Sequence, residues 1–203
     1  MFDNEVNKFL KPYLEKPAKL IVNLNFNANQ ITFVGLIFGI FCFYFIVSGE
    51  FFLALIFFTL NRLFDGLDGY VARQTKITDL GGFYDIVFDF IIYSLVPLGF
   101  ILNDTSNSFA FSFLLSSFIG TCSTFLASAL IIQKNKDKLK LSHHKSFFYS
   151  RGVAEGLETI ICFVLMFVFP NKAFIFAWGF GLLCWITVIV RILYIKTILL
   201  KIN

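Results

Sequence analysis

Charged residues are scarce in this chain. They make up 15% of its 203 residues, whereas soluble domains usually carry about 25%. Hydrophobic residues make up 58% of the chain, and its mean hydropathy is +0.79. These values disfavour a soluble globular protein and exclude a disordered chain, a collagen and a coiled coil. What remains is an integral membrane protein, for which we expect no nucleic-acid partner.

Cysteine is also rare. The four cysteines lie in apolar runs and show no CxxC spacing, which argues against a disulfide framework or a zinc site. We interpret them as small buried hydrophobic residues. Phenylalanine is abundant, with 30 residues, and we attribute this to coding bias combined with lipid exposure rather than to a binding site.

Six apolar runs follow one another along the chain, and a transmembrane helix needs about 20 apolar residues. We therefore predict an all-α polytopic membrane protein with six transmembrane helices. Residues 1–203 form a single domain in this interpretation, with an interfacial segment at 1–28 and the six-helix bundle at 29–203. The runs span about 31–48, 51–72, 80–102, 109–132, 150–169 and 173–198.

The N-terminal segment mixes apolar with basic residues over positions 3–22. This pattern is typical of an amphipathic helix that lies on the membrane surface, although a solvated tail is an alternative. Pro12 and Pro17 are expected to break the segment into short pieces.

The distribution of cations predicts the orientation in the membrane. The termini and the second and fourth loops carry most of the basic residues, whereas the opposite loops hold only Lys172. By the positive-inside rule, both termini and these two loops face the cytoplasm. The cytoplasmic set comprises Lys8, Lys11, Lys16, Lys19, Arg73, Lys76, Lys134, Lys136, Lys138, Lys140, Lys145, Lys196 and Lys201.

Four aspartates fall inside or at the ends of apolar runs, where a charge is costly and usually functional. Asp65 and Asp68 share one helix face, and Asp85 and Asp89 share another. Both pairs flank the turn at 73–79, so we expect two neighbouring antiparallel helices whose carboxylates converge. Because we find no matching buried cation, we predict a site for a hard divalent cation such as Mg²⁺, Mn²⁺ or Ca²⁺.

Small residues and one arginine accompany the aspartates. Gly66, Gly69, Gly81 and Gly82 would allow a ligand to approach the backbone closely. Arg73, one turn after Gly69, offers a planar donor fork that suits phosphate. Carboxylates, a metal and an arginine at the cytoplasmic membrane edge indicate phosphoryl chemistry on an amphiphilic substrate.

The spacing of these residues resembles the signature of the CDP-alcohol phosphatidyltransferase family. The resemblance extends to the six-span layout and to the segment Asn29–Thr32, although Ala28 stands where the family has proline. The eight matching positions are Asp65, Asp68, Gly69, Ala72, Arg73, Gly81, Asp85 and Asp89.

The resemblance implies an enzyme of phospholipid biosynthesis. This membrane enzyme would transfer a phosphatidyl group from CDP-diacylglycerol to a small polar alcohol and would release CMP. Asp65, Asp68 and Asp85 would hold two divalent cations, Mg²⁺ or Mn²⁺, and Asp89 would touch the metal site and act as general base. The implied CDP contacts are Asn29, Thr32, Gly69, Arg73 and Thr78, and a homodimer is expected.

The acceptor alcohol is less well defined. Basic residues in the C-terminal half, Lys134, Arg151 and Arg191, resemble those with which some family members bind a phosphorylated acceptor. We therefore favour a phosphorylated polyol, either glycerol 3-phosphate or inositol phosphate. Glu155 and Glu158 could pair with Arg191 or Arg151, or could instead bind the ammonium group of serine or another amino alcohol.

Other acceptors and functions are compatible with parts of the pattern. Inositol and phosphatidylglycerol are further acceptors within the family. A cation transporter would also place carboxylates in its spans, but the acidic residues cluster in one hairpin without an inverted repeat. A scaffold protein would have no reason for four aspartates in its spans.

Overall fold

The computed structural model describes residues 3–135 and 154–202, and this part of the chain contains helices and no strands. The prediction of an all-α fold is therefore confirmed. The helices are α1 (Asp3–Asn23), α2 (Ala28–Val47), α3 (Phe51–Gln74), α4 (Asp79–Asn103), α5 (Ser108–Lys134), α7 (Gly156–Val168) and α8 (Ala173–Ile202), with short 3₁₀ turns η1 (Thr105–Asn107) and η2 (Pro170–Lys172).

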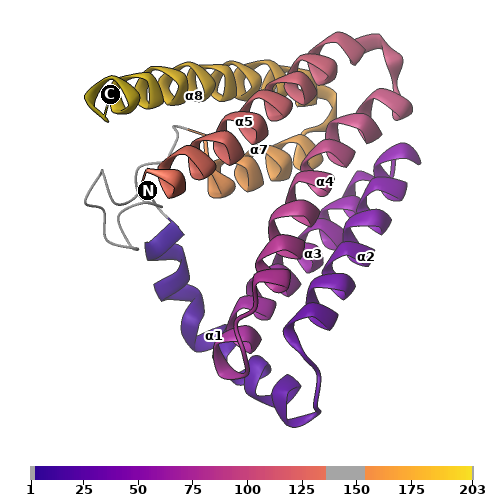
Figure 1. The fold of residues 1–203 in the computed structure, drawn as a ribbon. Helices are drawn as coiled ribbons and strands as arrows, with labels where there is room; N and C mark the ends of the chain where they lie inside the picture. Colours follow the sequence, from indigo (N-terminus) through magenta and orange to yellow (C-terminus); the bar gives the residue numbers. More distant parts are fainter. Residues whose placement is uncertain (1–2, 136–153, 203) are drawn as a thin grey trace.

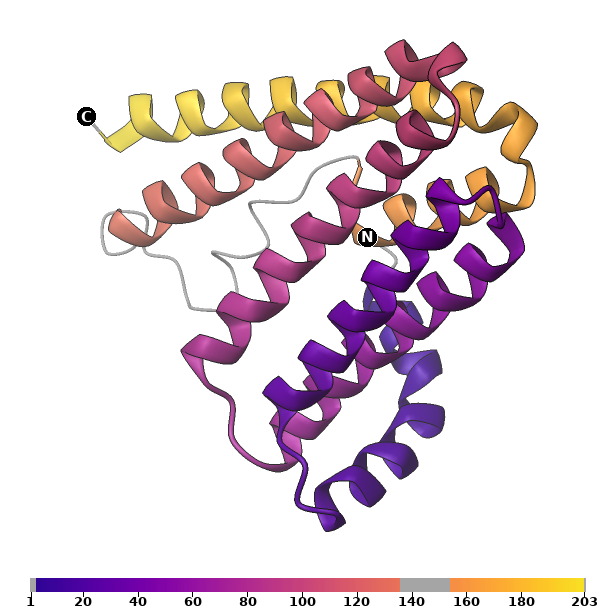
Figure 2. The same cartoon turned by 90° about the vertical axis from the view of Figure 1, so that its right-hand side faces the viewer.

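The helices form two groups. Figure 1 shows α2, α3 and α4 in one group and α5, α7 and α8 in the other, and Figure 2 shows α5 alongside α8. The groups are joined where α4 packs against α5 and α3 packs against α7. They diverge away from this junction, so the helix ends that carry the aspartates lie in the more open part of the molecule.

Aromatic rings fill the core where the groups meet. Phe58 of α3 contacts the rings of Phe163 and Phe167 of α7, with centroids 5.7 and 5.5 Å apart. Phe100 of α4 stacks on Phe111 of α5 at 5.0 Å. All five rings are buried, so phenylalanine supplies much of the packing between the groups as well as apolar surface.

Within residues 3–135 and 154–202, four helical segments are long and apolar enough to cross a membrane: Ala28–Val47, Asp79–Asn103, Thr105–Lys134 and Pro170–Leu200. They support an integral membrane protein. The second and fifth predicted runs correspond to α3 and α7, which do not meet these criteria. α3 carries several charged residues, and α7 has 13 residues, so six spans remain a prediction.

The N-terminal helix differs from the prediction. α1 runs continuously from Asp3 to Asn23 through Pro12 and Pro17, so the expectation that the prolines break it is wrong. Leu14 and Ala18 are buried in a cluster with Leu67 and Val71 of α3. We attribute the continuity of α1 to this packing, because tertiary contacts can offset the hydrogen bonds that proline removes.

The arrangement of α3 and α4 also differs from the prediction. They are consecutive and antiparallel (Figure 2), but each packs chiefly against α2 rather than against the other. α2 approaches both helices closely through glycines. A Cβ at Gly35 would lie 3.4 Å from Cβ of Phe64, and one at Gly39 would lie 2.1 Å from Cδ1 of Ile92. Asp65 and Asp68 lie on α3, and Asp85 and Asp89 lie on α4.

Candidate active site

Three of the four predicted aspartates meet in one cluster. Carboxylate oxygens of Asp65 and Asp68 on α3 and of Asp85 on α4 lie within 4.8 Å of one another. Asp68 is buried, Asp65 is half-buried and Asp85 is exposed. The predicted convergence is confirmed for these three residues. Their hard oxygen donors fit a divalent cation such as Mg²⁺ or Mn²⁺.

The first apolar helix contributes to the cluster. Thr32 of α2 donates a hydrogen bond from its hydroxyl to Oδ2 of Asp68 at 2.6 Å. Both residues are buried, so this bond holds one carboxylate in a fixed orientation. Thr32 was predicted as a CDP contact, and the structure shows that it also positions an acidic side chain.

Asp89 lies beside the cluster rather than within it. Its Oδ1 accepts a hydrogen bond from Nη1 of Arg62 at 2.8 Å, and the same nitrogen lies 3.7 Å from Oδ2 of Asp65. The Arg62 side chain is 11% exposed. The sequence-based prediction that no cation inside the protein pairs with the aspartates is therefore wrong. Arg62 lies one turn before Asp65 on the same face of α3, and this spacing was the available signal for it.

A first cavity, of about 190 Å³, opens between α2, the end of α3 and the start of α4. All five residues predicted to contact CDP line it, together with Asp68 and Asp85 from the cluster. The five are Asn29, Thr32, Gly69, Arg73 and Thr78. The structure thus brings the predicted nucleotide contacts together, and it places two carboxylates on the same wall.

Local structure explains the shape of this cavity. The Thr78 side chain caps α4 by accepting a hydrogen bond from the Gly81 amide at 3.1 Å. The guanidinium of Arg73 lies over the ring of Tyr70, 4.3 Å from its centroid. A Cβ at Gly69 would lie 3.4 Å from Nη1 of Arg73, so glycine leaves room for the guanidinium beside the cavity.

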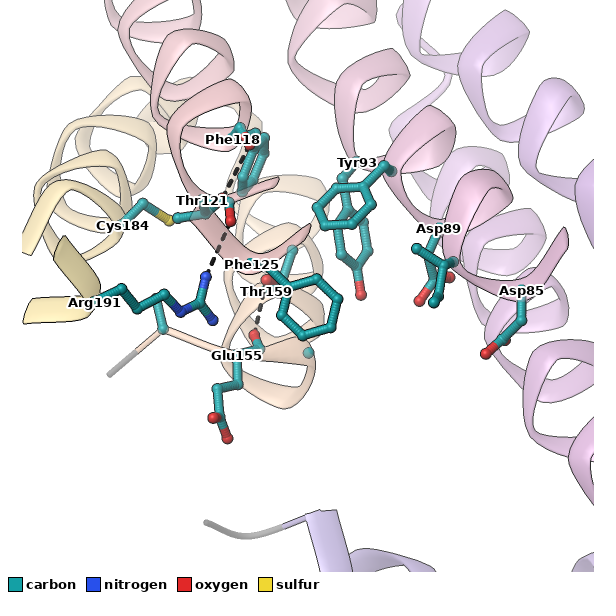
Figure 3. Close-up of a pocket in the computed structure, with 14 residues that line it drawn as sticks. Asp85, Asp89, Tyr93, Phe118, Thr121, Phe125, Glu155, Thr159, Cys184 and Arg191 are labelled. Atoms are coloured by element: carbon teal, nitrogen blue, oxygen red, sulfur yellow. Dashed lines mark hydrogen bonds between the residues drawn. The ribbon is translucent and has the colours of Figure 1, made fainter. Parts of the chain in front are cut away.

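A second cavity, of about 290 Å³, is lined by Asp85 of the cluster together with residues of α5, α7 and α8 (Figure 3). Asp85 and Asp89 of α4 form one wall, and Arg191 of α8 lies opposite. Asp85 lines both cavities. The two cavities therefore adjoin the same carboxylate, which allows two substrates to meet there. Tyr93, Thr121 and Thr159 also line this cavity and were missed by the sequence analysis.

Arg191 is 8% exposed and is held in place by α5. Its Nη1 donates to the carbonyl oxygen of Thr121 at 3.0 Å, and its guanidinium lies 5.6 Å from the centroid of the Phe125 ring. These contacts leave the guanidinium on the cavity wall (Figure 3). A buried cation that lines a cavity is suited to an anionic ligand.

The other predicted acceptor residues have different placements. Lys134 is exposed in the last turn of α5 and does not line either cavity. Arg151 lies outside the described residues. Glu155 lines the second cavity, whereas Glu158 accepts a hydrogen bond from the Glu155 amide at 3.0 Å and caps α7.

Comparisons with known proteins show the family of this chain. The sequence model of the family described as CDP-alcohol phosphatidyltransferase matches residues 25–195. The chain is 42% identical over 193 residues to an inner membrane protein of Escherichia coli, covering 95% of this chain and 94% of that protein. It is 25% identical over 190 residues to archaetidylinositol phosphate synthase of Pyrococcus horikoshii, covering 93% and 94%.

Solved structures show the same fold. Phosphatidylinositol phosphate synthase of Mycobacterium tuberculosis with CDP-DAG bound matches with a TM-score of 0.75 and 18% identity, over 91% of this chain and 94% of that one. The same enzyme with manganese and citrate matches with a TM-score of 0.69 and 18% identity, over 91% and 89%. The family match spans most of the chain and includes the aspartate cluster, so the protein belongs to the CDP-alcohol phosphatidyltransferase family of enzymes.

Proposed function

We propose that this protein transfers a phosphatidyl group from CDP-diacylglycerol to the hydroxyl of a phosphorylated polyol and releases CMP. The observation that carries the proposal is the pair of cavities that adjoin Asp85, one lined by the predicted nucleotide contacts and one by Arg191. The CDP-DAG-bound neighbour supports the donor. Two similar proteins whose products are inositol phosphate lipids, by their names, support the acceptor class.

In this proposal, different residues bind the metal ions, the CDP moiety of the donor and the phosphate of the acceptor. Asp65, Asp68 and Asp85 would hold the divalent cations, and the manganese-bound neighbour supports this assignment. When bound, such cations neutralise the pyrophosphate and the charge that develops on the leaving group. Arg73 and Thr78, in the first cavity, bind the CDP moiety. Arg191, in the second, binds the phosphate of the acceptor.

The transfer itself needs one proton acceptor. The acceptor's hydroxyl oxygen attacks the phosphorus of the phosphatidyl group, and the hydroxyl proton passes to the carboxylate of Asp89. The bond between this phosphorus and the bridging oxygen of CMP breaks, and CMP leaves with that oxygen. Asp89 lines the acceptor cavity beside the cluster (Figure 3), which suits this role.

We further propose that the enzyme is a single domain in the bacterial inner membrane, with six spans, an interfacial α1 and a cytoplasmic site. The apolar helices and the similar inner membrane protein support the membrane. The basic loops support the orientation. A homodimer is proposed from the family resemblance alone.

An amino alcohol is the second candidate acceptor, because Glu155 also lines the second cavity. Its partner in that hypothesis, Glu158, caps α7 instead, which leaves one carboxylate rather than two for an ammonium group. We therefore rank serine and other amino alcohols below phosphorylated polyols.

The test is CMP release by the purified protein from CDP-diacylglycerol with Mn²⁺, against glycerol 3-phosphate, inositol phosphate, inositol and serine. We expect release with a phosphorylated polyol, and we expect Arg191→Gln to raise the acceptor KM by about tenfold to 100-fold, as for a lost charged hydrogen bond. Lys172→Gln, an exposed cation in η2, is the matched control and should leave this KM unchanged. Release with serine alone would overturn the proposed acceptor.

A further inference from the structure

Tyr93 is a buried tyrosine that lines the second cavity from α4, one helical turn after Asp89. Residues four apart share one face of a helix, so the two side chains border the same space. Tyr93 is 9% exposed. Figure 3 shows it between Asp89 on one side and Arg191 on the other, with its hydroxyl directed into the cavity. This hydroxyl is therefore placed to contact a ligand that reaches both residues.

Aromatic packing fixes the position of the hydroxyl. The ring of Tyr93 contacts the rings of Phe118 and Phe163, with centroids 6.0 Å apart in both cases. The guanidinium of Arg62 lies 5.6 Å from the centroid of the same ring. A Cβ at Gly156 would lie 3.8 Å from the hydroxyl oxygen, so this oxygen lies beside the start of α7. A ring held in this way presents its hydroxyl at one place.

Two threonine hydroxyls line the same cavity. Thr121 donates its hydroxyl proton to the carbonyl oxygen of Phe118 at 3.0 Å, and Thr159 donates to that of Glu155 at 2.9 Å. Because both protons are engaged, these two oxygens can serve a ligand only as hydrogen-bond acceptors. The phenolic hydroxyl of Tyr93 can donate as well as accept. The cavity therefore offers the two kinds of partner that an alcohol group needs.

These hydroxyls stand among apolar side chains, including Ile86, Phe118 and Phe125. In such a pocket, a few well-placed polar groups determine which ligand fits. A ligand that leaves a buried polar group unpaired loses affinity. An acceptor with a hydroxyl opposite Tyr93 would therefore bind better than the same molecule without that hydroxyl.

We propose that Tyr93 is a specificity-determining residue that forms a hydrogen bond with a non-reacting hydroxyl of the acceptor. The inference rests on the proposed function and narrows it. Arg191 would bind the phosphate, and a second hydroxyl, besides the one that attacks, would bind Tyr93. Glycerol 3-phosphate and inositol phosphate meet this condition. A phosphorylated diol such as 3-hydroxypropyl phosphate does not, because its one hydroxyl is the one that reacts.

The test removes one hydroxyl from the protein and one from the acceptor. Tyr93→Phe keeps the ring and its packing. With glycerol 3-phosphate, the acceptor KM of this variant should rise by about three- to tenfold, as for one lost hydrogen bond. With 3-hydroxypropyl phosphate, which lacks the middle hydroxyl, Tyr93→Phe should leave the acceptor KM within about twofold. The KM for CDP-diacylglycerol should not change, since Tyr93 does not line the first cavity.

Inositol phosphate and its single-deoxy analogues form the corresponding pairs if inositol phosphate is the better acceptor. Tyr84→Phe is the matched control. Tyr84 is half-buried on the same helix and packs on the rings of Phe33 and Phe88, at 5.2 and 5.5 Å, but it lines neither cavity. Its replacement should change no KM.

Thermal unfolding in detergent gives a readout that needs no turnover, because a ligand that binds the folded state raises the midpoint. With Mn²⁺ present, glycerol 3-phosphate or inositol phosphate should stabilise Tyr93→Phe less than it stabilises the natural protein. Inorganic phosphate, which offers only the group that Arg191 would bind, should stabilise both equally. The midpoints without ligand verify that the variant is folded.

An equal rise in KM for both acceptors of a pair would overturn the inference, because Tyr93 would then support the cavity without contacting that hydroxyl. An unchanged KM for every phosphorylated polyol would overturn it as well. Absence of CMP release by the natural protein with all acceptors would contradict the proposed function instead. The unfolding midpoints would then decide the inference on Tyr93, and equal shifts for the natural protein and Tyr93→Phe, including none, would overturn it.

Discussion

At the scale of single residues, four aspartates with the same chemistry have different surroundings. Asp68 is buried and accepts a hydrogen bond from Thr32, while Asp85 is exposed between two cavities. Asp89 accepts a hydrogen bond from Arg62. Environment rather than residue type therefore separates the proposed metal ligands from the proposed base.

Replacement of Asp89 gives the most direct residue-scale prediction. Asp89→Asn keeps the size of the side chain and removes its ability to accept a proton, so kcat should fall by about 10²- to 10⁴-fold. Binding of CDP-diacylglycerol should be largely preserved, because Asp89 does not line the first cavity. Steady-state CMP release and a separate nucleotide-lipid binding assay measure the two effects.

Asp104→Asn is the matched control for this substitution. Asp104 is exposed at the corner between α4 and η1, where its carboxylate accepts a hydrogen bond from the Ser106 amide at 2.9 Å. Its replacement should leave kcat unchanged. Near-normal turnover by Asp89→Asn would remove Asp89 from the proton-transfer step.

The sequence predicted the composition of the site better than its internal contacts. Fixed spacing on two helices was sufficient to bring Asp65, Asp68 and Asp85 together. The contact between Arg62 and Asp89 was not predicted. It depends on how Asn61, the neighbour of Arg62, reaches Gly35 on another helix. Likewise, spacing could not show that Glu158 caps a helix.

At the scale of helices, close packing of α2 against α4 determines where Asp85 and Asp89 lie. α4 carries both aspartates, and Ile92, 1% exposed, fills the contact opposite Gly39. Any side chain at Gly39 would have to displace this buried residue. The helix contact therefore couples the stability of the bundle to the geometry of the site.

Gly39→Ala should destabilise the protein. The added Cβ would lie 2.1 Å from Cδ1 and 2.9 Å from Cγ1 of Ile92, and overpacking of this kind typically costs about 1–3 kcal/mol. Thermal unfolding in detergent, followed by circular dichroism, should show a lower midpoint than for the natural protein.

Gly179→Ala provides the control, because it also replaces a helical glycine by alanine, and nothing lies within 4 Å of the added Cβ. Its midpoint should be equal or higher, since alanine favours helix by about 1 kcal/mol relative to glycine. A midpoint for Gly39→Ala that matches that of Gly179→Ala would show that α2 and α4 can separate without loss of stability.

Helix positions could be predicted from the apolar runs, whereas exceptions arose where packing outweighs local preference. α1 continues through two prolines because Leu14 and Ala18 pack on α3. α3 and α4 each pack chiefly on α2, although they are adjacent in sequence. Local sequence gives no information on such contacts, which depend on the shapes of helices that meet only in the folded chain.

At the scale of the whole molecule, the distribution of charge relates the site to the membrane. The loop between α3 and α4 and the end of α5 are basic, whereas the corner at η1 carries no lysine or arginine. The first cavity is lined partly by residues of the α3–α4 loop, including Lys76 and Ile77. A cytoplasmic loop would therefore place the nucleotide site where a soluble product such as CMP can leave.

Cysteine labelling tests this orientation. Gln74→Cys at the end of α3 and Thr105→Cys in η1 introduce thiols at exposed positions at opposite ends of α4. A membrane-impermeant maleimide applied to intact spheroplasts should label Thr105→Cys and should label Gln74→Cys only after permeabilisation. The unsubstituted protein is the control, because Cys42, Cys162 and Cys184 are buried and Cys122 is half-buried. Labelling of Gln74→Cys in intact spheroplasts would place the aspartate cluster at the outer face, where the positive-inside rule does not allow it.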